Sequence, residues 1–299
     1  MEIFNAVILG IVQGLTEFLP VSSSGHLVLL QKIFDVKEPE LFFDTMLHFG
    51  TLIAVFIVLW KDIWELIKKP IQPLTGYIIL GTIPAVIAAL LFRKPIENLF
   101  TSAQFLGICF LITTALLISA ELLYRRAKNT TENKSLSGMN WLDALLIGLM
   151  QAIAIPPGIS RSGATISGAL FRRLDRDSAA RFSFLLSIPA ILGAVALHSK
   201  DLVKDLISKS PLPQGFEMVT VSVTVAETAT ATEAATTAAS FGPLAVIIGT
   251  ITAGLVGFFA IKIMLKIIRE KSLFGFAIYT GVLGVFILFD QLVTKFIFS

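Results

Sequence analysis

The sequence predicts an all-α polytopic membrane protein made of two inverted-topology repeats, each with one re-entrant helix pair and three transmembrane helices, six spans in total. An apolar composition, six apolar runs of spanning length and a polar motif that occurs twice predict this class. Of the 299 residues, 55% are hydrophobic and 15% charged, and the mean hydropathy is +0.82. Soluble domains carry about 25% charged residues, so a soluble domain is excluded. The single cysteine, Cys109, excludes a disulfide framework and a cysteine-based metal site.

The apolar runs define the elements in order. A span needs roughly 17 to 25 apolar residues. Runs of this length lie near residues 42–60, 74–92, 104–123, 182–198, 244–261 and 274–296. Two further apolar stretches, 3–30 and 141–171, are interrupted by Gly, Pro and Ser. Irregular backbone at membrane depth is tolerated only where protein buries it or a watery cavity meets it, so we expect both stretches to be re-entrant helix pairs. No basic region precedes the first stretch, and we expect it to be retained rather than cleaved.

An internal repeat relates the two interrupted stretches. At an offset of 138 residues, the identities are Ala6/Ala144, Gly10/Gly148, Gln13/Gln151, Ser22/Ser160, Ser24/Ser162 and Gly25/Gly163. Further along, the five residues from Gly81 match those from Gly249 in four places, at an offset of 168. The second half therefore contains an insertion, which we assign to the Thr/Ala-rich tract at 219–240.

These observations divide the chain. Residues 1–125 are expected to form the first repeat with the Gln/Glu, Ser and His motif, 126–140 a cytoplasmic linker, and 141–299 the second repeat with the Ser-Arg-Ser motif. Residues 210–242 are expected to be a low-complexity extracytoplasmic loop. Because each half has an odd number of spans, the second half is inverted, and the site of such repeats lies at their interface near the midplane.

The Lys and Arg residues predict the orientation. One set of connections carries 15 of them and the other carries 8; the richer set is 61–73, 124–140, 172–181 and 262–272. Rich and poor connections alternate along the chain, and loops rich in Lys and Arg face the cytoplasm. We therefore expect the first re-entrant pair to enter from outside and the second from the cytoplasm.

Polar residues within the apolar stretches predict the site. Glu17, the serines Ser22, Ser23 and Ser24, and His26 lie in the first stretch, where a charged group is costly and marks a functional site. In the second stretch, Pro156-Pro-Gly is followed by Ser160 and Arg161, a helix start with free N–H groups and a guanidinium suited to phosphate oxygens. A carboxylate beside a phosphate is expected to hold a divalent cation that bridges the two. The sequence thus predicts a metal-assisted phosphoryl site.

Two long motifs resemble a known family over nearly the whole chain. Gln13-x-x-x-Glu17 with Pro20-Val-Ser-Ser-Ser-Gly-His26, and Pro157-Gly-Ile-Ser-Arg-Ser-Gly-Ala-Thr165, are similar to the BacA/UppP family of undecaprenyl pyrophosphate phosphatases. The resemblance implies an integral enzyme of the plasma membrane that converts undecaprenyl pyrophosphate to the monophosphate and phosphate. It also implies recycling of this lipid carrier for peptidoglycan synthesis, bacitracin resistance, and an active site open to the extracytoplasmic side.

The resemblance also implies roles for residues. Ser23 matches the proposed nucleophile and Glu17 and Gln13 match the metal-binding positions, where Gln13 has one charge fewer than a glutamate. The cation is expected to be Mg²⁺, with Ca²⁺ as an alternative. His26 is either the base for Ser23 or the nucleophile itself, and both alternatives stay open. The residues expected to hold the phosphate are Ser160, Arg161, Ser162, Gly163, Thr165, Ser22 and Ser24.

Two alternatives belong to other classes. Inverted repeats with broken helices also form transporters, so a polyisoprenyl-phosphate flippase could use the same site for binding alone. A type 2 phosphatidic acid phosphatase is disfavoured, because the chain lacks an Arg-Pro motif and has Ser167 where that superfamily needs a histidine. The expected partners are the pyrophosphate lipid and the membrane, with no nucleic acid, and a homodimer stays an open alternative. Four further polar residues are expected to be structural or interfacial, although His48 could face the cavity: His48, Asp44, Glu121 and Asp290.

Overall fold

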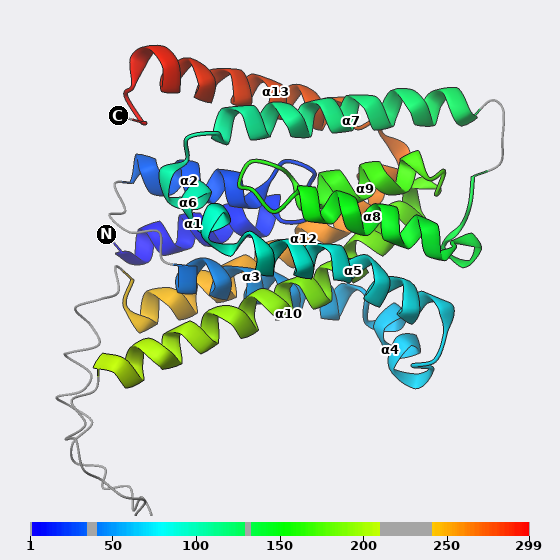
Figure 1. Ribbon diagram of the computed structural model, residues 1–299, viewed down its shortest axis with the longest axis horizontal. Helices are drawn as coiled ribbons and strands as arrows, with labels where there is room; N and C mark the ends of the chain where they lie inside the picture. The colour runs from blue at the N-terminus through cyan, green and yellow to red at the C-terminus, as the bar shows by residue number, and fades with distance from the viewer. Residues whose placement is uncertain (1, 35–40, 129–132, 210–240, 299) are drawn as a thin grey trace, which may run out of the picture.

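The computed structural model describes residues 2–34, 41–128, 133–209 and 241–298, and its regular elements are helices (Figure 1). Apart from one isolated bridge between Lys134 and Leu174, the described residues form no strand. The predicted loop at 210–242 falls almost entirely outside them. The elements are α1 (Glu2–Thr16), α2 (Ser23–Ile33), α3 (Leu41–Val58), α4 (Trp60–Lys68), α5 (Pro73–Leu91), α6 (Arg93–Ser102), α7 (Leu106–Lys128), η1 (Leu136–Gly138), α8 (Trp141–Ile153), α9 (Arg161–Phe171), α10 (Arg176–Lys209), α12 (Pro243–Glu270), α13 (Phe274–Phe289) and η2 (Asp290–Thr294).

The described helices confirm the membrane class. Five of them are long and apolar enough to cross a membrane, and a sixth span results if α3 and α4 count as one. The five are α5, the first part of α7, the first part of α10, α12, and α13 with η2, each at a predicted apolar run. The predicted run 42–60 differs, because the chain bends by 79° between α3 and α4. The chain is therefore a multi-pass membrane protein.

The bend after α3 produces an amphipathic helix. In α4, the rings of Trp60 and Trp64 stack at 5.2 Å, and Lys68 lies 5.2 Å from the Trp64 ring. Tryptophan and lysine side chains suit the boundary between lipid and water. The span therefore ends at the bend, where the apolar run is followed by these tryptophan and lysine side chains.

The helix α12 is longer than its apolar run predicts. α12 continues nine residues past the predicted end at 261, to Glu270, through Lys262, Lys266 and Arg269. Lysine and arginine lower the hydropathy of a segment but favour the helical conformation almost as well as alanine does. Hydropathy therefore detects the lipid-embedded part of a helix and not its end.

α1 and α8 are too short to cross a bilayer. With 15 and 13 residues they measure about 22 and 20 Å, against a hydrocarbon thickness of about 30 Å. Each is followed by a turn, and each packs against the helix after the turn, α2 or α9. In Figure 1 both helix pairs lie beneath α7 and α13, which run side by side.

Glycines allow each short helix to pack on a helix of the other half of the chain. A Cβ atom on Gly10 of α1 would lie 2.6 Å from the carbonyl oxygen of Gly249 of α12. A Cβ atom on Gly148 of α8 would collide with the backbone of Gly81 of α5. These are the glycines that the two sequence offsets relate, so the two contacts are reciprocal. Small residues let helices in a membrane approach this closely.

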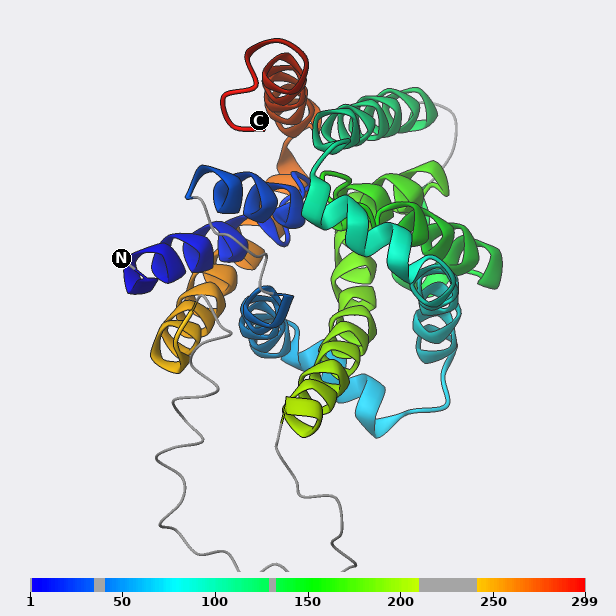
Figure 2. The ribbon, with the colours of Figure 1, turned by 60° about the vertical axis from the view of Figure 1, so that its left-hand side comes forward.

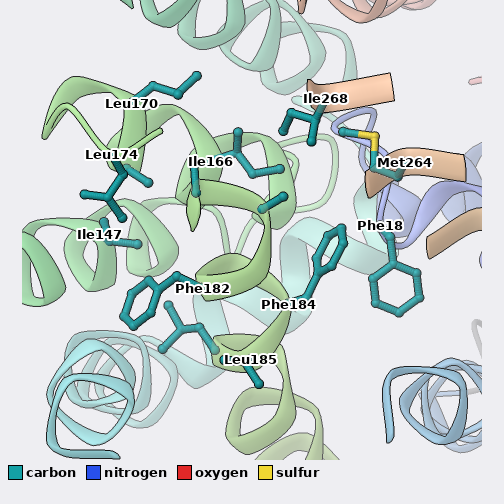
Figure 3. Packing of buried hydrophobic residues seen from close by; sticks show 14 of the residues in the cluster. Phe18, Ile147, Ile166, Leu170, Leu174, Phe182, Phe184, Leu185, Met264 and Ile268 are labelled. Atoms are coloured by element: carbon teal, nitrogen blue, oxygen red, sulfur yellow. The ribbon is translucent and has the colours of Figure 1, made fainter. Parts of the chain in front are cut away.

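The main core extends to the turn after the first short helix (Figure 3). Phe18 meets Phe184 of α10 edge to face, with ring centroids 5.3 Å apart. Ile147 of α8 and Ile166 of α9 belong to the same buried cluster, as does Met264 of α12. Because Phe18 is held in this core, the position of the preceding residue, Glu17, is also set.

The basic connections make internal ion pairs in addition to predicting orientation. Asp143, at the start of α8, is fully buried and accepts from Lys134 Nζ at 2.9 Å and from Arg172 Nε at 2.7 Å. Burial alone would raise the pKa of the Asp143 carboxyl, but the hydrogen bonds from Lys134, Asn140 and Arg172 hold it below its usual value. Arg176 pairs with Glu121 in the same way, at 2.7 Å. The linker, α8 and the turn before α10 are thereby joined.

The reciprocal glycine contacts can be tested by adding one methyl group. We expect Gly10→Ala and Gly148→Ala each to destabilise the protein by about 1–3 kcal/mol, because the new Cβ meets backbone that cannot move away. Gly193→Ala in α10 is the control, since its Cβ has open space and alanine favours the helix by about 1 kcal/mol. Thermal unfolding in detergent measures all three. Equal midpoints for the three variants would contradict the assigned contacts.

Candidate active site

The first motif lies in the turn after α1. Residues 17–22 form this turn, and α2 follows from Ser23. Ser22 caps α2, because its Oγ accepts a hydrogen bond from the Gly25 N–H at 3.2 Å. The φ angle of Ser22 is 69°, a conformation that costs a non-glycine residue roughly 1–3 kcal/mol and that collects at functional sites. It turns the chain so that the Ser23 hydroxyl reaches back to Glu17.

The second motif lies in the turn between α8 and α9. Gly158 has a φ angle of +95°, which glycine adopts without steric cost. Thr113 of α7 supports the turn: its hydroxyl donates to the Gly158 carbonyl and accepts from the Ser160 N–H, both at 2.9 Å. Ser160 then caps α9 by accepting from the Gly163 N–H at 3.0 Å. The role of Thr113 had no signal in the sequence, since it lies in an apolar run far from the motif.

The two turns are in direct contact. A Cβ atom on Gly25 of the first motif would lie 2.8 Å from the Gly158 Cα, so a larger residue does not fit there. The Ser162 hydroxyl donates to the Leu19 carbonyl at 2.9 Å. The two stretches that the 138-residue offset relates thus contribute to one polar site.

Glu17 is at the centre of this site. Its side chain is 3% exposed, and Oε2 accepts from Ser23 Oγ at 2.6 Å and from Gln13 Nε2 at 2.9 Å. Oε1 is paired with the guanidinium of Arg161. A buried carboxylate is tolerated only with partners of this kind. Glu17 therefore joins the hydroxyl of the first motif to the guanidinium of the second.

Arg161 keeps one donor free. It is the first residue of α9, and its Nη2 makes the ion pair with Glu17. Its Nη1 is buried and has no hydrogen-bond partner among the described residues. A guanidinium with an unused donor at the start of a helix can bind an oxygen of an anion.

Most hydroxyls that were predicted to bind phosphate have partners within the protein. The Ser22 and Ser160 hydroxyls cap helices, and that of Ser162 binds the Leu19 carbonyl. The Thr165 hydroxyl donates to the Arg161 carbonyl at 2.8 Å and lies 2.6 Å from Ser183 Oγ. Their observed contacts hold the two turns in shape. The other two groups that were predicted to bind phosphate also have partners. Ser24 Oγ lies 3.4 Å from Ser22 Oγ, and the Gly163 N–H donates to the Ser160 hydroxyl that caps α9.

His26 has different partners from those expected. Its Nδ1 lies 2.7 Å from the Ser22 carbonyl oxygen, and its Nε2 lies 2.7 Å from the Tyr279 hydroxyl. Within the described part of the chain, the Ser23 hydroxyl bonds to Glu17 and not to His26. Tyr279 was missed because it lies 253 residues further on, as an ordinary aromatic residue in an apolar run.

His48 of α3 also belongs to the site. Its Nε2 lies 3.5 Å from Glu17 Oε2, and its Nδ1 lies 2.7 Å from the Asp44 carbonyl oxygen. The sequence favoured a structural role for His48, with the cavity as an alternative. Only the packing of α3 against the first turn brings this imidazole to the carboxylate.

The donor atoms around Glu17 fit a divalent cation that also binds substrate. Gln13 Oε1 is buried and has no partner among the described residues, and His48 Nε2 faces the same carboxylate. Within those residues no cluster of three or more His, Cys, Asp or Glu side chains could hold a metal ion by itself. Mg²⁺ commonly uses one or two carboxylates and completes its shell with water and phosphate oxygens. The site is therefore compatible with a cation held jointly by protein and phosphate.

Comparison with known proteins identifies the family. Residues 6–286 match the family described as bacitracin resistance protein BacA. The chain is 44% identical over 296 residues to an undecaprenyl-diphosphatase of Carboxydothermus hydrogenoformans, which covers 99% of this chain and 100% of that protein. It is 42% identical over 290 residues to the undecaprenyl-diphosphatase of Halothermothrix orenii, covering 96% and 98%, and 41% identical over 296 residues to undecaprenyl-diphosphatase 3 of Bacillus cereus, covering 99% and 100%. By the extent of these matches, the chain belongs to the bacitracin resistance protein BacA family.

Proposed function

We propose that the chain is an integral membrane phosphatase that hydrolyses undecaprenyl pyrophosphate to the monophosphate and phosphate. The observation that carries this proposal is the buried contact of Glu17 with both Ser23 and Arg161. It combines a hydroxyl nucleophile, a carboxylate that can take its proton, and a guanidinium suited to phosphate oxygens. The names of the relatives, undecaprenyl-diphosphatase, support this substrate.

Ser23 is the proposed nucleophile. Its Oγ attacks the terminal phosphorus while its proton passes to Glu17 Oε2, 2.6 Å away. The bond from that phosphorus to the bridging oxygen breaks, and the lipid monophosphate leaves with the electron pair. Water then attacks the phosphorus of the phosphoserine, and the bond from phosphorus to Ser23 Oγ breaks. The phosphate leaves with the water oxygen and its protons, and Glu17 returns its proton to Ser23 Oγ.

Arg161 stabilises the charge on the transferred phosphoryl group. Its buried Nη1, which has no partner among the described residues, is the donor available to a phosphate oxygen. The first turn of α9 adds backbone N–H groups and the positive end of the helix dipole. An arginine in this role contributes about 10³–10⁵ to the rate of phosphoryl transfer in other enzymes.

His26 has two candidate roles. Because the Ser23 hydroxyl donates to Glu17, the geometry favours Glu17 over His26 as the acceptor of the Ser23 proton. His26 can then act as the base for water in the second step, or form the bond to phosphorus itself. The stability of the trapped phosphoenzyme separates these roles, since phosphohistidine is labile to acid and phosphoserine is not.

We also propose a divalent cation, Mg²⁺ or Ca²⁺, beside Glu17. Gln13, Glu17 and His48 would hold it, with Gln13 Oε1 as the oxygen that lacks a partner among the described residues. When bound, such a cation neutralises negative charge on pyrophosphate oxygens. These protein residues would bind the cation and orient the phosphate beside it.

Hydrolysis of the carrier fits the biology that the family description indicates. It would return the monophosphate for peptidoglycan synthesis, and resistance to bacitracin is the property for which the family is described. The flippase alternative receives no support from the comparisons, because the relatives are named for hydrolysis. Whether two copies associate stays a prediction.

The proposed architecture is a pair of inverted repeats in the plasma membrane. The reciprocal contacts of Gly10 with Gly249 and of Gly148 with Gly81 support it, since they exchange equivalent helices between the halves. Figure 2 shows α7 and α13, the last spans of the two halves, side by side. Basic connections on alternate sides support an active site that opens to the extracytoplasmic face.

Replacement of Ser23 or Arg161 tests the hydrolytic site. We expect Ser23→Ala to abolish phosphate release. We expect Arg161→Gln to lower kcat by about 10³-fold, because it removes the guanidinium charge and leaves the Glu17 carboxylate without its ion pair. Ser137→Ala is the matched control, since Ser137 is exposed in η1. The assay is phosphate release from purified protein in detergent, with isoprenoid pyrophosphates of several lengths. Release by Ser23→Ala at the wild-type rate would reject this nucleophile, and no release by the wild type from any of these lipids would reject the enzyme.

Removal of the metal tests the cation. We expect excess EDTA to stop phosphate release and added Mg²⁺ or Ca²⁺ to restore it. Titration with Mn²⁺, followed by its electron paramagnetic resonance signal, reports binding without turnover. We expect His48→Gln and Glu17→Gln to weaken Mn²⁺ binding by about 10-fold or more, since the first removes an imidazole nitrogen and the second removes a negative charge. Full activity in EDTA, or Mn²⁺ binding unchanged in Glu17→Gln, would argue against the assignment.

Labelling of single cysteines tests the orientation. In a Cys109→Ala background, we expect Ser102→Cys to react with an impermeant maleimide in intact cells and Ser137→Cys to react only after the membrane is opened. Both serines are exposed, one at the end of α6 and one in η1. The opposite labelling pattern would reverse the proposed orientation.

A further inference from the structure

Both ring nitrogens of His26 have partners, and these determine where the ring proton lies. Nδ1 lies 2.7 Å from the Ser22 carbonyl oxygen, which can only accept. In the neutral ring the proton is therefore on Nδ1, and Nε2 carries the lone pair. The hydroxyl of Tyr279, 2.7 Å from Nε2, donates to that lone pair.

Aromatic contacts fix the plane of the same ring. The rings of His26 and Tyr279 are stacked, with an interplanar angle of 6° and centroids 5.7 Å apart. Phe110 of α7 meets the imidazole edge to face at 5.4 Å. His26 is 8% exposed, so residues of α2, α7 and α13 together leave the ring little freedom to turn.

Tyr279 is itself carried by a closely packed helix. Thr280, the next residue of α13, shares a hydrogen bond of 2.8 Å with Thr114 of α7. A Cβ atom on Gly284 would lie 3.0 Å from the Gly107 carbonyl oxygen, so the two backbones are in near contact. Figures 1 and 2 both show α7 and α13 running together. The hydroxyl of Tyr279 is thus set by the fold and not by a loop.

We propose that Tyr279 is a positioning residue for the phosphatase reaction, and that it acts by holding His26 Nε2 at a fixed point on α2, one helical turn after Ser23. A tyrosine hydroxyl can donate to the lone pair of Nε2 and can accept from Nε2–H once His26 has taken up a proton. It therefore keeps the ring in place in both protonation states. This inference rests on the proposed function, and it applies to His26 as the base for water. Because the lone pair of Nε2 accepts from Tyr279, the Tyr279 hydroxyl passes its proton to Nε2 and takes one from the water.

Removal of the hydroxyl alone tests this proposal. Tyr279→Phe keeps the stacked ring, and Tyr77→Phe in α5 is the matched control, since Tyr77 packs against the main core. We expect kcat of Tyr279→Phe to fall about 10-fold with KM changed less than about twofold, while the control keeps both values. We expect Tyr279→Leu, which also loses the ring, to be slower still.

Nitrogen NMR of the full chain in detergent reports the contact directly. The chain has three histidines, and the His26 signals are those lost in His26→Gln. We expect one Nδ1–H tautomer in the wild type, and in Tyr279→Phe a shift of the Nε2 signal toward that of a lone pair without a donor.

The outcomes separate this proposal from the one on which it rests. An unchanged Nε2 signal, or a kcat equal to that of the Tyr77→Phe control, would overturn the role of Tyr279 while leaving the phosphatase intact. A wild type that releases no phosphate would instead reject the proposed function and this inference with it.

Discussion

The pairing of the Glu17 carboxylate holds the site together. A buried carboxylate without partners would cost several kcal/mol, so the fold has to supply a cation and hydrogen-bond donors at that point. Arg161 and the Ser23 hydroxyl meet this need, and they come from the second and the first motif. The same contact therefore stabilises the folded protein and assembles the reacting groups. Substitution of one partner affects both, because the other is left buried and unpaired.

Close helix packing makes this pairing geometrically available. Glycines bring α1 onto α12 and α8 onto α5, and Gly25 lets α2 meet the turn that contains Gly158. In lipid, close contact of small residues replaces much of the hydrophobic driving force available in water. Packing of Phe18 against Phe184 then fixes the position of the neighbouring residue, Glu17. The polar site thus depends on apolar contacts immediately around it.

The chemistry depends on which polar groups of the site already have hydrogen-bond partners within the protein and which do not. Serine and threonine hydroxyls of both motifs mostly cap helices or support turns, which leaves few side chains free to act. Two of the buried atoms that lack a hydrogen-bond partner among the described residues are Arg161 Nη1 and Gln13 Oε1. Arg161 Nη1 suits a phosphate oxygen and Gln13 Oε1 suits a cation. A pyrophosphate with its bound cation would use both atoms. His26 is held apart from Ser23 by its contact with Tyr279, so the two residues can serve different steps.

The sequence by itself determined the membrane class, the spans, and both motifs, because lipid accepts only long apolar helices and makes each polar exception conspicuous. It could not place the bend after α3 or the end of α12, since hydropathy follows lipid contact and not hydrogen bonding along the helix. It singled out Glu17, Ser23 and Arg161 as site residues, but not the hydrogen bond and the ion pair that join them. Thr113 and Tyr279 look like ordinary members of apolar helices, and from the sequence the cavity is only an alternative place for His48. The tertiary structure brought all three to the site. The physical reason is that the free-energy cost of burying a polar group depends on that residue alone, and so it shows in the sequence. Which residue pairs with it depends on the packing of helices from distant parts of the chain.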